Sequence, residues 1–558
     1  MHRPLRGSRP LRLLLLWLAL LAGAEAAHAQ QLPAAEALRE ALRDRVGLPL
    51  VPGESSVDSV PLQAREELTR LYLLRFFQPA WISVDGTPLP QAQQFAERLG
   101  QVESDGLRAA TYRQRVIAER IAALTGDPAS ITLEQLVDLE MLLTDAWLTL
   151  ADHLLRGRLD PEQLQDQTLA TPRELDLVVL LDTALAEGDP VGALDSLQPT
   201  YPQYARLREA LARYRELALQ PEPPALPAGA ALRIGDLDER VPLLRQRLRY
   251  HGDLGEDAAL DSPRFDGEVD AAVLRFQARH GLEADGIVGR GSRAALNVAH
   301  PQRVQQIEAN LERFRWLPQS LEPRHLRVNI ADFSLEVIEE GQRVLAMDVI
   351  VGRPYRQTPV FSGRLTYLVF SPYWHIPDSI ARKDILPRAQ REPEKLVADG
   401  YRALSGWGAN EREIDLLGVD WSRYSRRNLP YRFRQDPGPR NALGRVKFML
   451  PNRFSVYLHD TPAQELFDRN QRDFSSGCVR VSQPLELATY LLRDDPRWSA
   501  ETIRAAMDSG TEQNVSVPRA VPVYVYYLTA WVDDAGLMQF REDIYERDRR
   551  LLEALGAN

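Results

Sequence analysis

Two short stretches, Tyr457-Leu-His-Asp-Thr-Pro462 and Ser475-Ser-Gly-Cys-Val-Arg-Val481, decide how this chain folds and what it can do. The first ends an alternating segment that predicts a β-strand with His459 at its end. The second places Cys478 after a Ser-Ser-Gly turn and before a short apolar stretch. Two elements that end at one edge of a sheet can bring a histidine and a cysteine into hydrogen-bond reach. The pattern therefore predicts a paired imidazole and thiol.

This pairing has a chemical meaning, because a cysteine is a useful nucleophile only as the thiolate. A free thiol has a pKa of about 8.5, so a neighbouring imidazole is needed to take its proton near neutral pH. The amides of Gly477 and Cys478 can point at the carbonyl under attack, as an oxyanion hole requires. Two alternatives stay open: Cys478 is a buried, inert side chain, or His375 is the base.

The sequence around these stretches predicts a β-rich domain over residues 325–500. Between residues 384 and 440 the pattern is irregular, charged and aromatic, which favours an insertion that forms a lid over the substrate. Residues 518–558 predict a C-terminal hairpin and helix, with a strand at 521–530 and a helix at about 541–555. The other alternating segments are residues 325–331, 333–338, 365–370 and 454–458.

The first 29 residues have the features of a cleavable secretory signal peptide. Arginines precede a continuous apolar run from Leu13 to Ala24, and Ala27-His-Ala29 offers a cleavage site. The run is shorter than the ~20 residues that cross a bilayer, so no stable membrane span is expected. We therefore expect a periplasmic protein. In that oxidising compartment the single cysteine has no intramolecular disulfide partner.

Helical periodicity dominates the first half of the chain. Residues 32–219 predict a helical scaffold domain, in which no group of titratable residues forms a recognisable site. Residues 220–231 are rich in proline and predict a stiff linker. Residues 232–298 predict a compact helical module whose turns are Phe265-Asp-Gly267 and Asp285-Gly286.

Composition excludes several classes of partner. The chain has 78 acidic and 68 basic residues, a net charge of −10, so it offers no basic field for nucleic acid. Only Lys383, Lys395 and Lys447 are lysines, so 65 of the 68 basic residues are arginines. The sequence contains neither H-E-x-x-H nor a phosphate-binding glycine loop, so no metal and no cofactor is expected. The predicted fold is multidomain α+β, with a helical scaffold, a small three-helix module and a β-sandwich-like catalytic domain.

Two resemblances follow from these motifs. Residues 232–298 resemble a peptidoglycan-binding module of the small three-helix type. Residues 441–452, 459–462 and 475–480 resemble the catalytic core of L,D-transpeptidases with a YkuD-type domain, and the resemblance extends over residues 325–500. The order of the domains, a helical region followed by a binding module and then this core, is similar to that of the large periplasmic members of the family in Gram-negative bacteria.

The resemblance implies a role for each residue of the motif. Cys478 matches the nucleophile, and His459 matches the general base and acid. Gly477, Ser476 and Ser475 lie where the family places its oxyanion-hole and histidine-orienting groups.

The resemblance also implies residues that contact the substrate. Arg480 is expected either to hold a substrate carboxylate or to brace its loop. Tyr457 and Trp374 are expected either to line the substrate or to pack.

The implied reaction is the transfer of a peptidoglycan stem peptide in cell-wall remodelling. Cys478 attacks the carbonyl that joins meso-diaminopimelate to the terminal D-alanine of a tetrapeptide stem. A diaminopimelate amine of a second stem then takes the acyl group, which gives a 3-3 cross-link. Water as acceptor gives an L,D-carboxypeptidase, and a lipoprotein lysine gives protein anchoring. A non-enzymatic peptidoglycan-binding scaffold is the alternative from another class.

The same resemblance implies binding partners. Peptidoglycan stem peptides and glycan strands are the expected ligands, and other cell-wall synthases are expected protein partners. Carbapenems are expected to acylate Cys478.

Overall fold

A computed structural model of the protein describes residues 36–46, 56–57, 60–126, 131–164 and 174–556. The predicted signal peptide, residues 1–29, lies outside the described residues. The chain divides into two compact units, Met1–Arg158 with Arg173–Thr200 and Leu159–Pro172 with Tyr201–Asn558. No helix in the described ranges combines the length and the apolar composition that a membrane span requires.

The first unit is helical, as its periodicity predicts. Its longest helix, α5 (Leu133–Arg156), begins at a capping box in which Thr132 and Gln135 satisfy each other's backbone amides. The leucines of α5 at three- and four-residue spacing are buried in one apolar core. Further elements of this unit include a helix at residues 36–46, β1 (Ser56–Val57), β2 (Val60–Pro61), α2 (Arg65–Leu74), α3 (Pro90–Leu99), α4 (Gln114–Gly126), α6 (Leu177–Glu187) and α7 (Pro190–Asp195).

The second unit starts with helices. A three-helix module of α9 (Val241–Tyr250), α10 (Gly267–Arg279) and α11 (Arg290–Leu296) matches the predicted compact module and buries its own apolar core. Helix α8 (Pro202–Ala218) packs against α12 (His300–Arg315) through Leu207, Leu211, Ile307 and Leu311. The helical region expected at residues 32–219 is therefore divided, because α8 belongs to the second unit.

Eight strands of the second unit close into a barrel, in the order β11-β12-β13-β5-β4-β3-β14-β6. The sandwich-like arrangement expected for this domain is therefore wrong, although its β-rich character is confirmed. Inward and outward side chains alternate along a strand in a sandwich and in a barrel alike, so the sequence pattern does not reveal that the sheet closes into a barrel. The strands are β3 (Arg324–Asn329), β4 (Ser334–Glu339), β5 (Gln342–Ile350), β6 (Phe361–Phe370), β11 (Val446–Met449), β12 (Leu458–His459), β13 (Val479–Val481) and β14 (Gln513–Tyr526).

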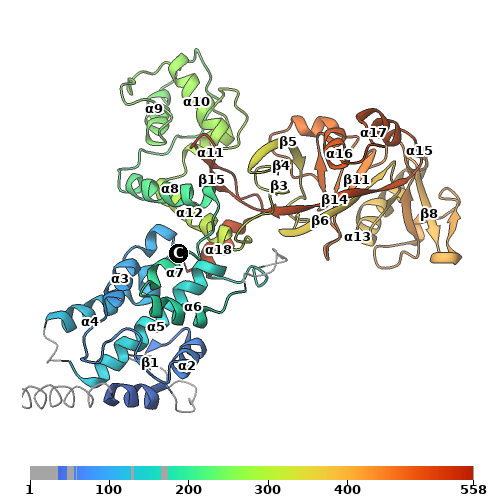
Figure 1. Ribbon diagram of the computed structural model, residues 1–558. Coiled ribbons are helices and arrows are strands. Elements are labelled where there is room, and N and C mark those ends of the chain that lie inside the picture. The colour runs from blue at the N-terminus through green and yellow to red at the C-terminus, as the bar shows by residue number, and fades with distance from the viewer. Residues whose placement is uncertain (1–35, 47–55, 58–59, 127–130, 165–173, 557–558) are drawn as a thin grey trace, which may run out of the picture. The chain divides into compact units, whose positions relative to one another are not determined.

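Strand β14 closes this barrel. It pairs in parallel with β3 and antiparallel with β6, and Figure 1 shows it running beside β6. The strand expected at residues 521–530 therefore ends at Tyr526 and belongs to the barrel. Beyond it, β15 (Ala530–Val532) and β16 (Met538–Phe540) form the predicted hairpin, and the last helix, α18 (Arg547–Ala554), starts six residues later than expected.

Two helices, α16 (Pro484–Leu492) and α17 (Ala500–Met507), contribute apolar side chains to the barrel core. Each lies between the last residues of the cysteine motif and strand β14. They fix the path of the chain from β13 to β14.

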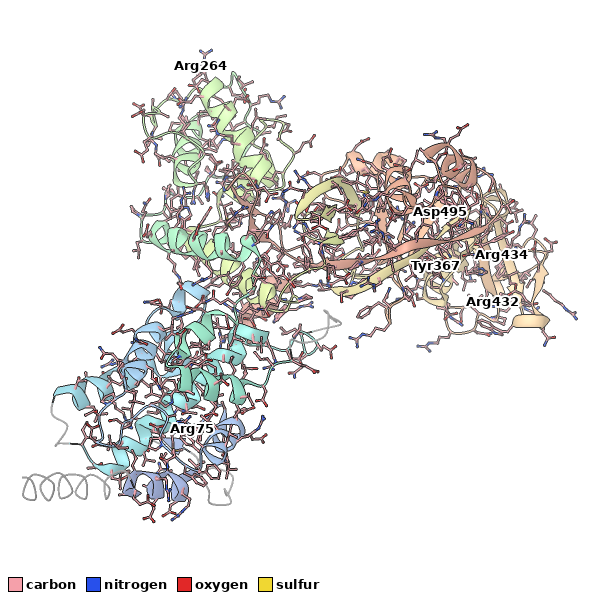
Figure 2. All side chains as sticks on the ribbon, in the orientation of Figure 1. Arg75, Arg264, Tyr367, Arg432, Arg434 and Asp495 are labelled. Carbon is pink, nitrogen blue, oxygen red and sulfur yellow. The ribbon has the colours of Figure 1, made fainter. Side chains whose placement is uncertain are left out.

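The predicted insertion at residues 384–440 has a fold of its own, which begins before residue 384 with β7 and α13. It contains a four-stranded sheet, β7-β10-β8-β9, and its own core around Tyr401, Trp421 and Phe433. Arg432 and Arg434 extend from β10 in Figure 2. Strands of two to five residues are too short for alternation to be recognised. The elements are β7 (Trp374–His375), α13 (Asp378–Ile380), α14 (Leu386–Arg391), α15 (Pro393–Ala398), β8 (Tyr401–Ser405), β9 (Arg412–Ile414) and β10 (Arg432–Gln435).

Candidate active site

The two predicted stretches meet at the parallel pairing of β12 with β13. Leu458 lies opposite Val479, and both are buried in the barrel core. Since side chains alternate along a strand, the residues on either side of each face away from that core. These residues are Tyr457, His459, Cys478 and Arg480, which the register places together on one face of the sheet.

Cys478 is half-buried on this face and interacts directly with Tyr457. Burial raises the pKa of the Cys478 thiol. A hydrogen bond from the Tyr457 hydroxyl and the charge of Arg480 lower this pKa, but by less than burial raises it. Burial and the neighbouring Cys478 raise the pKa of Tyr457, while a hydrogen bond with Trp374 lowers it. At neutral pH the thiol and the phenol are both protonated, so the Tyr457 hydroxyl is available as a hydrogen-bond donor.

His459 is buried and neutral. Burial, and then the charge of Arg480, lower the pKa of His459 to about 3. Its Nδ1 lies 2.5 Å from the carbonyl oxygen of Asp460. A carbonyl can only accept, so Nδ1 carries the proton and Nε2 is the nitrogen left to act as a base. The backbone of Leu443 forms a further hydrogen bond with this side chain.

The carboxylate of Asp460 holds the loop that carries this histidine. It accepts hydrogen bonds from the amides of Arg445 (2.8 Å) and Thr461 (2.7 Å).

The structure brings His459 and Cys478 to one face of neighbouring strands, as the sequence predicts. A direct hydrogen bond between them is not among those of the described residues, in which the thiol interacts with Tyr457 instead. The rival base, His375, lies on β7 of the insertion. Of the charged groups around it, Lys447, which lowers its pKa, and Glu512, which raises it, have the largest effects.

The turn before the nucleophile is closed by Ser475. The Gly477 amide donates to Ser475 Oγ (3.0 Å), and Ser475 Oγ donates to the Cys478 carbonyl (2.6 Å). Gly477 has a φ of +119°, in the region that favours glycine. Because the Gly477 amide is used inside the turn, it does not point at a substrate as expected. The amide of Cys478 makes no hydrogen bond within the described part of the chain and is the remaining backbone candidate.

A second layer of contacts supports this turn, and motif reasoning alone missed its connections. Thr358 Oγ1 accepts from the Gly352 amide (2.9 Å) and donates to the Gly477 carbonyl (2.9 Å). The Tyr545 hydroxyl donates to the Gly352 carbonyl. A Cβ on Gly352 would overlap the carbonyl oxygen of Arg356, so only glycine fits here. In the sequence, this supporting layer is indicated only by Gly352, which precedes Arg353 and lies six residues before Thr358.

The insertion contacts the nucleophile turn through Arg356. Its guanidinium forms a two-point ion pair with Asp384 (2.5 and 3.2 Å) and donates to Ser476 Oγ (2.8 Å). Asp384 belongs to the insertion, and Ser476 is exposed. Together with Trp374, this ion pair places the insertion against the face that carries Cys478.

Two arginines near this turn, one beside the thiol and one whose charge acts on the first, have no carboxylate within 4.0 Å among the described residues. They are Arg480 and Arg353, and the buried Nε of Arg480 makes no hydrogen bond there. Burial and the charge of Arg353 lower the pKa of Arg480. A guanidinium that braced its loop would donate to carbonyl groups, so this geometry favours the carboxylate-binding alternative for Arg480.

We expect Ser475→Ala to destabilise the protein by about 1 to 3 kcal/mol. The substitution leaves the buried Gly477 amide and the Cys478 carbonyl without their partner. The exposed Ser476→Ala is the matched control and should cost less than about 1 kcal/mol. Denaturant unfolding of both variants measures the difference, and equal losses would contradict the assigned hydrogen bonds.

We also expect the rate of Cys478 alkylation by iodoacetamide to increase with pH through a pKa above the ordinary thiol value of about 8.5. No step should occur between pH 5 and 7, because His459, with a pKa of about 3, is already neutral there. Tyr457→Phe removes a hydrogen bond that favours the thiolate, so its curve should shift to higher pH. A step near pH 6.5, or a curve that Tyr457→Phe leaves unmoved, would contradict this electrostatic description.

Comparisons with known proteins match three parts of the chain. Residues 323–515 match the "L,D-transpeptidase catalytic domain" family, 238–296 the "Putative peptidoglycan binding domain" and 66–211 the "Scaffold domain". A protein of Haemophilus influenzae named "Putative L,D-transpeptidase" is 33% identical over 247 residues, which are 44% of this chain and 49% of that protein. The chain thus spans about half the length of this curated relative.

Solved structures of L,D-transpeptidases are more distant. The enzyme from Stackebrandtia nassauensis is 14% identical, with 54% of this chain and 96% of that chain covered and a TM-score of 0.21. The enzyme from Mycobacterium smegmatis is 15% identical, with 37% and 58% covered and a TM-score of 0.18. The assignment therefore rests on the sequence matches: residues 323–515 are a YkuD-type L,D-transpeptidase catalytic domain, in one chain with a scaffold domain and a peptidoglycan-binding domain.

Proposed function

We propose that this chain is a peptidoglycan L,D-transpeptidase that transfers a stem peptide through a thioester on Cys478. The observation that carries the proposal is the shared face of β12 and β13. On that face a thiol, a neutral imidazole and an unpaired guanidinium lie together within a domain of this family. These are the groups that acyl transfer to and from a cysteine requires.

Acylation begins when the Cys478 thiol gives its proton to Nε2 of His459. The thiolate attacks the carbonyl between diaminopimelate and D-alanine, and the oxyanion accepts hydrogen bonds from the Cys478 amide and the Tyr457 hydroxyl. When the intermediate collapses, the C–N bond breaks and the imidazolium protonates the departing amine. D-Alanine leaves, and the stem remains as a thioester.

Arg480 explains how a histidine with so low a pKa acts as a base. Its charge is the second cause, after burial, of the low pKa of His459. A substrate carboxylate paired with Arg480 neutralises that charge, which raises the pKa of the imidazole. Substrate binding thereby prepares the base, and the free enzyme keeps a protonated, less reactive thiol.

The second half of the reaction transfers the acyl group to an amine. A neutral diaminopimelate amine of another stem attacks the thioester carbonyl and gives its proton to His459. The C–S bond then breaks, the imidazolium returns this proton to the Cys478 sulfur, and the new amide bond is the 3-3 cross-link. Water in place of this amine gives L,D-carboxypeptidase activity, and a lipoprotein lysine gives protein anchoring.

The remaining assignments belong to the same proposal. The match of residues 238–296 to a peptidoglycan-binding domain supports contact with glycan strands and stem peptides. The predicted signal peptide supports a periplasmic location, where other cell-wall synthases are the expected partners.

The test is incubation of the protein with purified disaccharide-tetrapeptide, followed by mass spectrometry. Release of D-alanine together with a cross-linked dimer is expected. Cys478→Ala should remove both products. His459→Ala should lose at least about 100-fold in rate at pH 7 and recover part of it at higher pH, where the thiol ionises unaided.

The matched control for His459→Ala is His375→Ala, which should keep most of the activity. D-Alanine release without dimer would indicate the carboxypeptidase. No reaction at all, or a Cys478→Ala chain that still turns over, would contradict the proposal.

A further inference from the structure

Three basic side chains form a row across the catalytic face. In the sheet, Lys447 on β11 lies opposite His459 on β12, and His459 lies opposite Arg480 on β13. Neighbouring strands are about 4.8 Å apart, and side chains at paired positions share a face. His459 therefore has a cation on each side, with Arg480 next to the nucleophile and Lys447 on the far side of the base.

Lys447 is half-buried and lacks the partner that such a charge requires. Among the described residues, its ammonium has no carboxylate within 4.0 Å and no hydrogen bond. Glu512 is the nearest acidic influence on it, but that carboxylate already accepts the Tyr373 amide (2.8 Å). The surface lysine Lys395, by contrast, has Glu392 at 3.6 Å. Withdrawing an ammonium from water is costly unless an anion compensates it, so this position fits a bound anion.

The other groups around Lys447 do not supply that anion. The charges of Lys447 and of Arg434 on β10 both lower the pKa of His375 on β7. The charges of Lys447 and of Arg480 both lower the pKa of His459. Both histidines are neutral near pH 7, and Glu512 is the one charged group that acts on the pKa of Lys447 among the described residues. An anionic ligand at this place would offset the desolvation that lowers the pKa of the ammonium.

The order of groups along the row matches the order of atoms in the donor. In the proposed mechanism the scissile carbonyl lies over Cys478, two residues from Arg480 along the chain, and the departing nitrogen is protonated by His459. In D-alanine the carboxylate is two bonds beyond that nitrogen, so it extends past His459 toward β11. An ammonium at the end of a flexible four-carbon stem suits this position.

We propose that Lys447 binds the terminal carboxylate of the departing D-alanine and forms a carboxylate subsite on the leaving-group side of His459. This inference rests on the proposed function and adds the residue that selects the donor. A stem that ends one residue after the scissile bond places its free carboxylate there. A stem that continues, or ends in an amide, offers no anion to the ammonium.

The experiment compares two donors on the full-length chain: disaccharide-tetrapeptide and the same molecule ending in D-alaninamide. The wild type should show kcat/KM for the acid about 10- to 100-fold above that for the amide, as expected for a charge-assisted hydrogen bond. Lys447→Gln should lose this preference by slowing only with the acid, and Lys447→Arg should keep part of it. Lys395→Gln is the matched control and should behave as the wild type.

A second measurement does not depend on turnover. In a Cys478→Ala background, calorimetry should give a higher affinity for the acid than for the amide, and Lys447→Gln should abolish the difference. This readout separates a failure of the proposed function from a failure of the subsite. Melting curves identify any variant that does not fold. If Lys447→Gln does not fold, the binding of acid and amide by Lys447→Arg is compared with that of the wild type instead.

Three results would overturn the subsite. One is a wild-type chain that does not distinguish acid from amide in binding. Another is a Lys447→Gln variant that keeps the preference. The third is an equal loss with both donors, accompanied by a shifted pH profile, which would mean that Lys447 acts only through the pKa of His459.

Discussion

The parallel pairing of β12 with β13 is the contact on which the site depends. These strands have two and three residues, yet their register decides that Leu458 and Val479 face the core together. Once these two are buried, alternation forces Tyr457, His459, Cys478 and Arg480 onto the opposite face. A shift of one residue would turn the histidine and the cysteine into the core. The support from Gly352 and Thr358, and the barrel that β14 closes, hold this register in place.

Burial gives the same site its electrostatic character. The thiol and the imidazole are both neutral in the free protein, because desolvation disfavours either charge. The cations around them, Arg480 and Lys447, lack carboxylate partners in the described part of the chain. These cations suit the carboxylates of the stem peptide that we propose as substrate. In the proposed mechanism, substrate binding pairs the cations and raises the pKa of the imidazole, so reactivity appears together with the substrate.

Much of this arrangement could be predicted from the sequence, and the missing parts share a cause. Cys478 and His459 were identified because each lies in a short, local motif, and the helices followed from periodicity. Barrel closure, the support of Gly352 by Tyr545 and the place of Lys447 beside His459 depend on pairings between residues far apart in the chain. The direction of the Gly477 amide, which donates within its own turn, depends on the φ angle of this residue. The fold of the insertion was missed because its strands are too short for a periodic pattern.

The central claim is that Cys478 carries the stem peptide as a thioester. Intact-mass spectrometry of the protein, quenched in acid during reaction with disaccharide-tetrapeptide, tests it most directly. The account predicts an adduct whose mass is that of the donor minus D-alanine, located on the peptide that contains Cys478 and removed by hydroxylamine. Release of D-alanine with no adduct at any reaction time, or an adduct on another residue, would contradict it.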